Sequence, residues 1–152
     1  MTDMILDRFW AEARSAVPTL PVAVPEAWAF GATAAHADEL LTLVLDCAKT
    51  GTASAMQDVK ADGEPVPEVG QASVILDSRG QPRAVIVTTA VDIVPFSQVS
   101  AEHAYSEGEG DRSLAAWREI HERFWAEHCQ GADGFSEDML VVCERFESVF
   151  AP

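Results

Sequence analysis

The chain has 152 residues, of which 48% are hydrophobic and 23% are charged. This length and composition predict one folded domain with its own hydrophobic core. The net charge of −15 opposes binding to phosphate backbones, and it argues against a broad surface that coats RNA or DNA. A local basic cleft for one nucleotide or a small ligand remains compatible with this charge.

The hydropathy pattern and the cysteines indicate the compartment. The sequence has no apolar run of the roughly 18 residues that a membrane span needs, so no membrane partner is expected. The N-terminus lacks the features of a signal peptide, which predicts a cytoplasmic protein. Cys47, Cys129 and Cys143 are odd in number and widely spaced, as is typical of reduced thiols.

Residues 1–27 are expected to form a helix and a connector that pack on the main domain, residues 28–152. Apolar residues at helical spacing predict a helix over 3–17, which a proline ends. Phe9 and Trp10 on this helix could make a homodimer contact if they were exposed, but core packing is the expected use.

A proline-rich connector over 18–31 follows, and its aromatic residues Trp28 and Phe30 are expected to cover the core. A second helix is predicted over 35–48, with Lys49 at its end. Small and hydroxylated residues then alternate, which predicts a strand over 51–55.

The second half of the chain is predicted to alternate between strands, loops and helices. The predicted elements are a loop over 58–70, a hairpin of strands over 72–77 and 82–94, a short helix over 97–105, an acidic loop over 107–111, a helix over 113–129, a loop over 131–134 and a final strand over 138–150. The strands are few and are not separated by regular crossover helices. This pattern predicts an α+β fold, with a small mixed sheet or barrel flanked by helices.

Lys49 and Thr52 form the first candidate site. A threonine hydroxyl is a poor nucleophile unless a base takes its proton, and a lysine is such a base only if its pKa is lowered. Residues 49 and 52 would face opposite sides of a regular strand. The pair therefore needs Lys49 at a helix-to-strand corner, with Gly51 permitting the bend; the alternative is a surface Lys beside structural threonines.

The acidic loop from Glu107 to Asp111 is the second candidate. Its carboxylates could orient a lysine, act as general acid or base, or bind a divalent cation, and the alternative is a solvated loop that leads into a helix. His121 and His128 lie seven residues apart on one predicted helix, which is too far for one metal ion without a third ligand between them. No metal site and no cofactor are predicted.

Several sequence blocks occur in order between Trp28 and Phe150. They are Lys49-Thr50-Gly51-Thr52-Ala53-Ser54, Gly63-Glu64-Pro65-Val66-Pro67, Ala84-Val85-Ile86-Val87-Thr88-Thr89, Glu107-Gly108-Glu109-Gly110-Asp111-Arg112-Ser113-Leu114 and Leu140-Val141-Val142-Cys143-Glu144-Arg145-Phe146. Together they resemble the ASCH domain family, as in a bacterial ASCH-domain protein. The resemblance implies a PUA-like fold, a small β-barrel with helices around a cleft that is associated with RNA or modified nucleosides.

The resemblance also implies roles for particular residues. One branch of the family hydrolyses the acetyl amide of N4-acetylcytidine with a Lys, a Thr and a Glu, which fall on Lys49, Thr52 and Glu107 of this sequence. These three are the candidate catalytic residues. The candidate ligand-binding residues are Thr50, Ser54, Arg79, Arg83, Glu109, Asp111 and Arg112.

Two departures from the family pattern bear on the substrate. Longer members often carry Glu at the position of Val87, and a Trp where this chain has Met56-Gln57. Three functions stay open: hydrolysis of an N-acyl amide on a cytidine-type substrate, binding of a nucleoside or short single-stranded RNA without turnover, and cleavage of single-stranded RNA.

Overall fold

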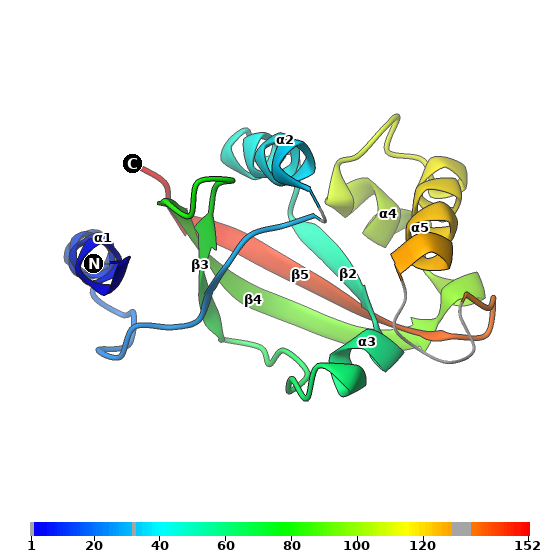
Figure 1. The fold of residues 1–152 in the computed structure, drawn as a ribbon, viewed down its shortest axis with the longest axis horizontal. Coiled ribbons are helices and arrows are strands. Elements are labelled where there is room, and N and C mark those ends of the chain that lie inside the picture. The colour runs from blue at the N-terminus through cyan, green and yellow to red at the C-terminus, as the bar shows by residue number, and fades with distance from the viewer. Residues whose placement is uncertain (1, 32, 129–134) are drawn as a thin grey trace.

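A computed structural model describes residues 2–31, 33–128 and 135–152 of the chain. Its centre is a five-stranded mixed sheet with the strand order β1-β3-β4-β5-β2 (Figure 1). The strands are β1 (Ala27–Trp28), β2 (Gly51–Ala55), β3 (Ala72–Leu76), β4 (Pro82–Pro95) and β5 (Leu140–Phe150). The predicted α+β class is confirmed.

The long strands β4 and β5 form the antiparallel backbone of the sheet, and irregularities near Val85 and Thr88 interrupt their register. The predicted hairpin of β3 and β4 is present, β1 adds to β3 in parallel, and β2 adds to β5 in antiparallel. Among the described residues, β1 and β2 do not pair, so they remain the two edges of the sheet.

Five α-helices and one 3-10 turn flank the sheet in the described parts of the chain (Figure 1). They are α1 (Thr2–Ala16), α2 (Ala34–Leu45), α3 (Met56–Ala61), the 3-10 turn η1 (Phe96–Gln98), α4 (Ala101–Glu107) and α5 (Leu114–His128). The Ser100 hydroxyl caps α4, and the Ser113 hydroxyl accepts from an amide in the first turn of α5.

Two predicted elements differ from the structure. The predicted loop over 58–70 begins with α3, because Met56, Gln57 and Lys60 are good helix formers that precede the Asp62-Gly63 stop. The predicted helix over 97–105 starts later and ends later, so Glu107 is the last residue of α4 and not the start of a loop. The predicted loop over 131–134 lies outside the described residues.

Three clusters of apolar side chains hold these layers together. One joins α2 to β3 and β4, and another joins η1, α4 and α5 to the other end of β5. The third packs α1 on the sheet and buries Phe9 and Trp10, with the Trp10 indole donating to the carbonyl of Pro21 at 3.0 Å. These two aromatics are therefore part of the core of this chain and not an exposed dimer surface.

Two smaller findings bear on the predictions from composition. No helix in the described part of the chain has the length and apolar character of a membrane span. Cys47 is exposed, Cys143 is buried and both are free thiols, while Cys129 lies outside the described ranges.

Candidate active site

Lys49 lies in the corner between α2 and β2, and its side chain is almost completely buried, with 2% of the residue exposed. The corner is made by Cys47, whose φ of 61° is left-handed. The amides of Ala48 and Lys49 both donate to the carbonyl of Leu43, which fixes the turn. The predicted bend at Gly51 is wrong, because Gly51 is an ordinary strand residue without a positive φ.

Gly51 has a different use, which is the close approach of α4. A side chain there would collide with the hydroxyl of Ser106, and the carbonyl of Ser106 accepts a 2.6 Å hydrogen bond from the amide of Thr50. Gly108, with a left-handed φ of 77°, caps the end of α4 and lies at the same contact. A Cβ there would lie 2.7 Å from the carbonyl oxygen of Ala48. The two glycines let the end of α4 lie against the start of β2.

This contact brings the carboxylate of Glu107 next to Lys49. Glu107 is 1% exposed, and its Oε1 lies 3.8 Å from Lys49 Nζ and 3.2 Å from His121 Nε2. Its Oε2 accepts from the Trp117 indole at 2.6 Å and from His103 Nε2 at 2.7 Å. Both carboxylate oxygens are thus surrounded by N–H groups, which is what makes a buried carboxylate tolerable.

The hydrogen-bond partners fix the protons on both histidines. Arg145 donates to His103 Nδ1 at 3.4 Å, so His103 carries its proton on Nε2 and donates it to Glu107. His121 Nδ1 lies 2.8 Å from the carbonyl oxygen of Trp117 and must donate to it, while its Nε2 faces the Glu107 carboxylate. His121 is therefore an imidazolium that pairs with Glu107.

The pKa shifts follow from this arrangement. Burial lowers the pKa of Lys49 from its usual value of 10.5, and the charges of Glu107 and Glu109 oppose that shift only in part. Burial would raise the pKa of Glu107, but the hydrogen bonds from both histidines and the nearby positive charges outweigh it and hold the pKa well below its usual range. Burial also disfavours charged His121, yet the Glu107 carboxylate raises the pKa of His121 above 6.5.

A small cavity of about 90 Å³ opens onto these groups and is lined by Lys49, Thr52, Glu107, Glu109 and His121, together with His36 and apolar residues. A larger cavity of about 570 Å³ lies beside it, and only the larger one reaches the 300–1,000 Å³ typical of ligand sites. Thr52 lines both cavities, as do Phe30 and Trp125. Thr52 is therefore at the junction between the Lys49–Glu107 pair and a space that can hold a ligand.

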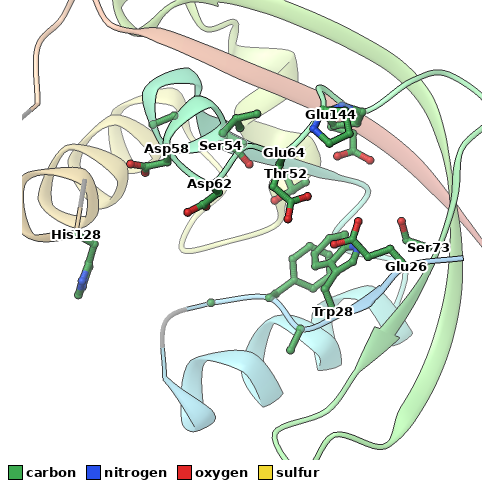
Figure 2. A pocket seen from close by; sticks show the side chains of 18 of the residues that line it. Glu26, Trp28, Thr52, Ser54, Asp58, Asp62, Glu64, Ser73, His128 and Glu144 are labelled. Atoms are coloured by element: carbon green, nitrogen blue, oxygen red, sulfur yellow. The ribbon is translucent and has the colours of Figure 1, made fainter. Parts of the chain in front are cut away.

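The larger cavity has two facing walls, and one of them carries a tryptophan. Figure 2 shows Trp28 and Glu26 on one wall, Asp58 and Asp62 on the other, and Glu144 beside the ribbon of β5. Trp28 is half-buried, and its ring contacts Phe30 edge-on with 4.7 Å between centroids. The tryptophan that was predicted to cover the core thus also lines the cavity.

The predicted site residues separate into groups. Lys49, Thr52, Glu107 and Glu109 meet at the small cavity, and Ser54 lines the larger one. Thr50 and Arg112 line a different hollow, where the Arg112 guanidinium stacks on the Tyr105 ring and donates to the carbonyl of Ala48. Arg79 and Arg83 lie beside α2 at the β3–β4 turn, and Asp111 is exposed and accepts from the amide of Ser113.

Glu107 is held in place by His103, Trp117 and His121, and none of these three was predicted to contact it. A signal was present, because His103 and Glu107 are four residues apart in α4, and Trp117 and His121 are four apart in α5. Such spacing puts two side chains on one face of a helix. What the spacing does not give is that the two faces meet.

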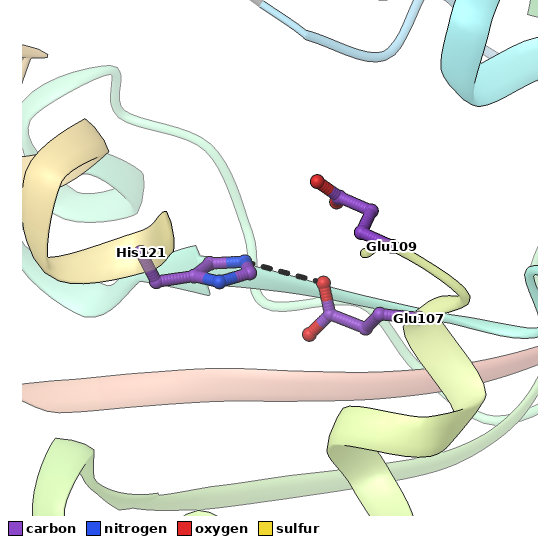
Figure 3. Close-up of side chains that lie close together, drawn as sticks. All are labelled: Glu107, Glu109 and His121. Atoms are coloured by element: carbon purple, nitrogen blue, oxygen red, sulfur yellow. Dashed lines mark ion pairs between the residues drawn. The ribbon is translucent and has the colours of Figure 1, made fainter. Parts of the chain in front are cut away.

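Glu107, Glu109 and His121 also offer a set of metal-ligand atoms that lie within 4.8 Å of one another (Figure 3). A cation there would need the Nε2 lone pair of His121, which the Glu107 carboxylate keeps protonated. It would also share Glu107 Oε1 with the Lys49 amine at 3.8 Å. The arrangement fits an ion-pair cluster better than a metal site.

Comparison with known proteins places this chain in a family. The model of the ASCH domain matches residues 26–150. The chain belongs to the ASCH domain family. This confirms the resemblance noted in the sequence, and with it the PUA-like fold.

Two solved structures that are more than 30% identical to this chain agree with this assignment. A protein from Enterococcus faecalis is 35% identical over 95% of this chain and 88% of its own, with a TM-score of 0.84. An ASCH domain from Lactobacillus crispatus is 31% identical over 94% of this chain and 93% of its own, with a TM-score of 0.80. The hypothetical protein PH0355, 13% identical over 80% of this chain and 98% of its own with a TM-score of 0.52, shares the fold alone. Among curated proteins, none matches the ASCH chain described here.

The glycine contact at the end of α4 gives a first prediction. Replacing Gly108 with alanine should lower the free energy of unfolding by more than the roughly 1–2 kcal/mol of a strained φ, because the new Cβ also meets the backbone of Ala48. Gly80→Ala is the matched control, since Gly80 has nearly the same φ, 76°, and open space around it. Urea unfolding of both variants measures the difference, and equal losses would contradict the role of the close approach.

Proposed function

We propose that this ASCH domain hydrolyses the N-acyl amide of an acylated cytosine nucleoside, with Thr52 as nucleophile and Lys49 as base. The observation that carries the proposal is the position of Thr52, at the junction of the small cavity with the larger one. A nucleoside fits the larger space, and an acyl group attached to its exocyclic nitrogen fits the smaller one, beside Lys49.

The proposed reaction has two steps. Thr52 Oγ attacks the acyl carbon while Lys49 Nζ takes the hydroxyl proton, and the C–N bond then breaks as Lys49 returns that proton to the departing amine. The products are free cytidine and an acyl ester on Thr52. Water activated by neutral Lys49 then cleaves the ester, which releases the carboxylic acid and restores the threonine.

The charge balance of the cluster supports Lys49 as the base. A lysine can take a proton only in its neutral form, and burial shifts its pKa in that direction. A carboxylate at 3.8 Å would normally keep the amine charged. Here Glu107 already has the His121 imidazolium as its counter-charge, so a second cation on Lys49 is not required.

The same cluster supports a positioning role for Glu107 rather than a role as proton donor. Its pKa lies well below the usual range, so Glu107 is ionised at neutral pH and has no proton to give to a leaving group. The carboxylate instead stabilises the ammonium that Lys49 forms after it takes the threonine proton.

The charge around the larger cavity supports a nucleoside over RNA. The described residues that line it include the acids Glu26, Asp58, Asp62 and Glu64, and no Lys or Arg. The three arginines among the candidate ligand-binding residues line other hollows. A phosphate at this mouth would meet several carboxylates and no Lys or Arg among the described lining residues, which opposes both a nucleotide and an RNA strand.

A second candidate, binding of the nucleoside without turnover, has one observation in its favour. Lys49 Nζ donates to the carbonyl of Gly51 at 2.8 Å and makes no hydrogen bond to the Thr52 hydroxyl within the described structure. Catalytic hydrogen bonds are often long before substrate binds, so this geometry fits both candidates.

Three probes test the proposal: N4-acetylcytidine, its 5′-monophosphate and a short single-stranded RNA. We expect conversion of the nucleoside to cytidine, at least about tenfold lower kcat/KM for the monophosphate, and no RNA cleavage. Binding of the nucleoside with no product would favour the second candidate. Cleavage of the RNA, or a preference for the monophosphate, would contradict the proposed substrate class.

Trp28 is proposed to stack on the base. Stacking on an aromatic ring contributes about 1–3 kcal/mol per base, so Trp28→Ala should raise the KM for N4-acetylcytidine by about fivefold to a hundredfold. Trp28→Phe should recover most of the loss, because it keeps a ring in the wall of the cavity. Steady-state kinetics measures both variants. Equal KM values for Trp28→Ala and the unmodified protein would contradict stacking at this position.

A further inference from the structure

A buried carboxyl group in the larger cavity has no part in the mechanism above. Glu144 of β5 is 8% exposed and lines this cavity. It is the register partner of Thr52 on β2, so the two side chains stand on the same face of the sheet. Paired residues on neighbouring strands have Cβ atoms about 4.5–5.5 Å apart, which puts Glu144 beside the proposed nucleophile.

Glu144 has weak compensation for its burial. Thr88 Oγ1 donates to Glu144 Oε2 at 2.6 Å, and no Lys or Arg lies among the described residues of the cavity. Burial raises the pKa of Glu144, and the Thr88 hydrogen bond opposes this only in part. The other titratable groups that face this space are Glu26, Asp58, Asp62, Glu64 and His128.

The hydrogen bond from Thr88 also sets the direction in which Glu144 can act. A neutral carboxyl carries one O–H donor and one carbonyl acceptor. Because Thr88 engages Oε2, a proton that Glu144 donates to a ligand has to be carried by Oε1. Among the described residues, Oε1 has no hydrogen-bond partner, so this O–H is available to a ligand in the cavity.

We propose that Glu144 recognises the edge of the base, with its neutral carboxyl donating to ring N3 and accepting from the N4–H of the acylated cytosine. This inference rests on the proposed function for the identity of the substrate. The N3/N4 edge is adjacent to the scissile amide, and Glu144 is adjacent to Thr52. One pairing therefore orients the base and brings the acyl carbon to the hydroxyl.

Glu144 acts here as a specificity residue. A ring nitrogen that is methylated or protonated cannot accept from it, and an ionised Glu144 has no proton to donate. Affinity should thus fall as the pH rises above the pKa of Glu144, by up to about tenfold for each pH unit. A glutamine at this position keeps one donor and one acceptor at every pH, because its amide does not titrate in this range.

The test measures binding without turnover, in the Thr52→Ala background. N4-acetylcytidine is titrated calorimetrically into Thr52→Ala, Thr52→Ala/Glu144→Gln and Thr52→Ala/Glu144→Leu, at about pH 6 and about pH 8. We expect the Kd of the first protein to rise at least about fivefold between the two pH values, that of the Gln variant to stay constant, and the Leu variant to bind at least about tenfold more weakly than the Gln variant at both.

Thermal unfolding of each protein shows whether it is folded. If the Leu variant does not fold, the role of Glu144 is decided by the pH dependence of Kd in Thr52→Ala and in Thr52→Ala/Glu144→Gln. An equal pH dependence in the Gln variant, or none in either protein, would overturn the role of Glu144. The expected binding pattern in a protein that shows no turnover would instead reject the hydrolase and retain this base recognition. Absence of binding in all three proteins would overturn both.

Discussion

Replacing Lys49 with methionine is expected to lower the kcat for N4-acetylcytidine by about 10²–10⁴-fold, the usual contribution of a general base. Methionine fills a similar buried volume and removes only the amine, so the chain should stay folded. The Glu107 carboxylate keeps His103, Trp117 and His121 as its partners in this variant. The loss should therefore appear in kcat and not in stability.

Lys49→Arg separates a base from a positive charge. An arginine keeps the charge beside Glu107 but does not give up its proton in a protein. If Lys49 is the base, the Arg variant should be as inactive as the Met variant. Substantial activity with Arg would mean that the site uses a fixed charge, as a ribonuclease-type mechanism would.

The pH profile gives an independent check on Lys49. The base must be neutral, so kcat should rise with pH up to the lowered pKa of Lys49 and then level off. The free energy of unfolding also rises with pH in this range, because the unfolded chain binds a proton on Lys49 that the folded chain has released. The contribution of this group to folding therefore increases as the pH rises from the lowered pKa toward 10.5. A flat kcat profile would contradict the assignment.

Replacing Glu107 with glutamine is expected to lower the free energy of unfolding by about 3–5 kcal/mol, the cost of removing one partner from a buried ion pair. The variant leaves the His121 imidazolium without its counter-charge at a position that is 8% exposed. It also gives the Trp117 and His103 donors a neutral acceptor in place of a carboxylate. Urea unfolding at about pH 6 measures the change.

Glu109→Gln is the matched control, because Glu109 is a neighbouring acid with its nearest ion-pair contact to His36 at 4.0 Å. Glu109→Gln should lower the free energy of unfolding by less than about 1 kcal/mol. The difference between the two variants should be greatest between pH 4.5 and pH 6.5. The contribution of Glu107 is lost as the pH falls below 4.5 toward its lowered pKa, and that of His121 is lost as the pH rises through its raised pKa. Similar losses for both acids would contradict the central position of Glu107.

The sequence was informative where the structure depends on local pattern. The helix that leads to Lys49, the strand that holds Thr52 and the β3–β4 hairpin all follow from hydrophobic spacing and turn residues. The corner at Cys47 does not, because a left-handed cysteine has no signature in the sequence. Gly51 was predicted to permit a bend. A glycine is needed there instead because Ser106 of α4, which is distant in the chain, packs against it.

The candidate site was less predictable than the fold, because its geometry depends on contacts between distant segments. Glu107 becomes a partner of Lys49 only through the docking of α4 on β2, and the histidines reach Glu107 only because α4 and α5 pack together. Glu144 faces Thr52 through the register of two strands that are about ninety residues apart in the chain. The arginines at 79 and 83 failed to join the site because they line a separate hollow against α2, with Leu41 and Leu45.

The role of Thr52 as the nucleophile is tested by comparing the conversion of N4-acetylcytidine to cytidine by the unmodified protein and by Thr52→Ala. Thr52 is only partly buried, and the alanine variant should remain as stable as the parent to within about 1 kcal/mol. We expect one acetate released for each cytidine by the unmodified protein, and at least about a thousandfold lower kcat in Thr52→Ala. Equal turnover by the two proteins, or no turnover by the unmodified protein, would contradict it.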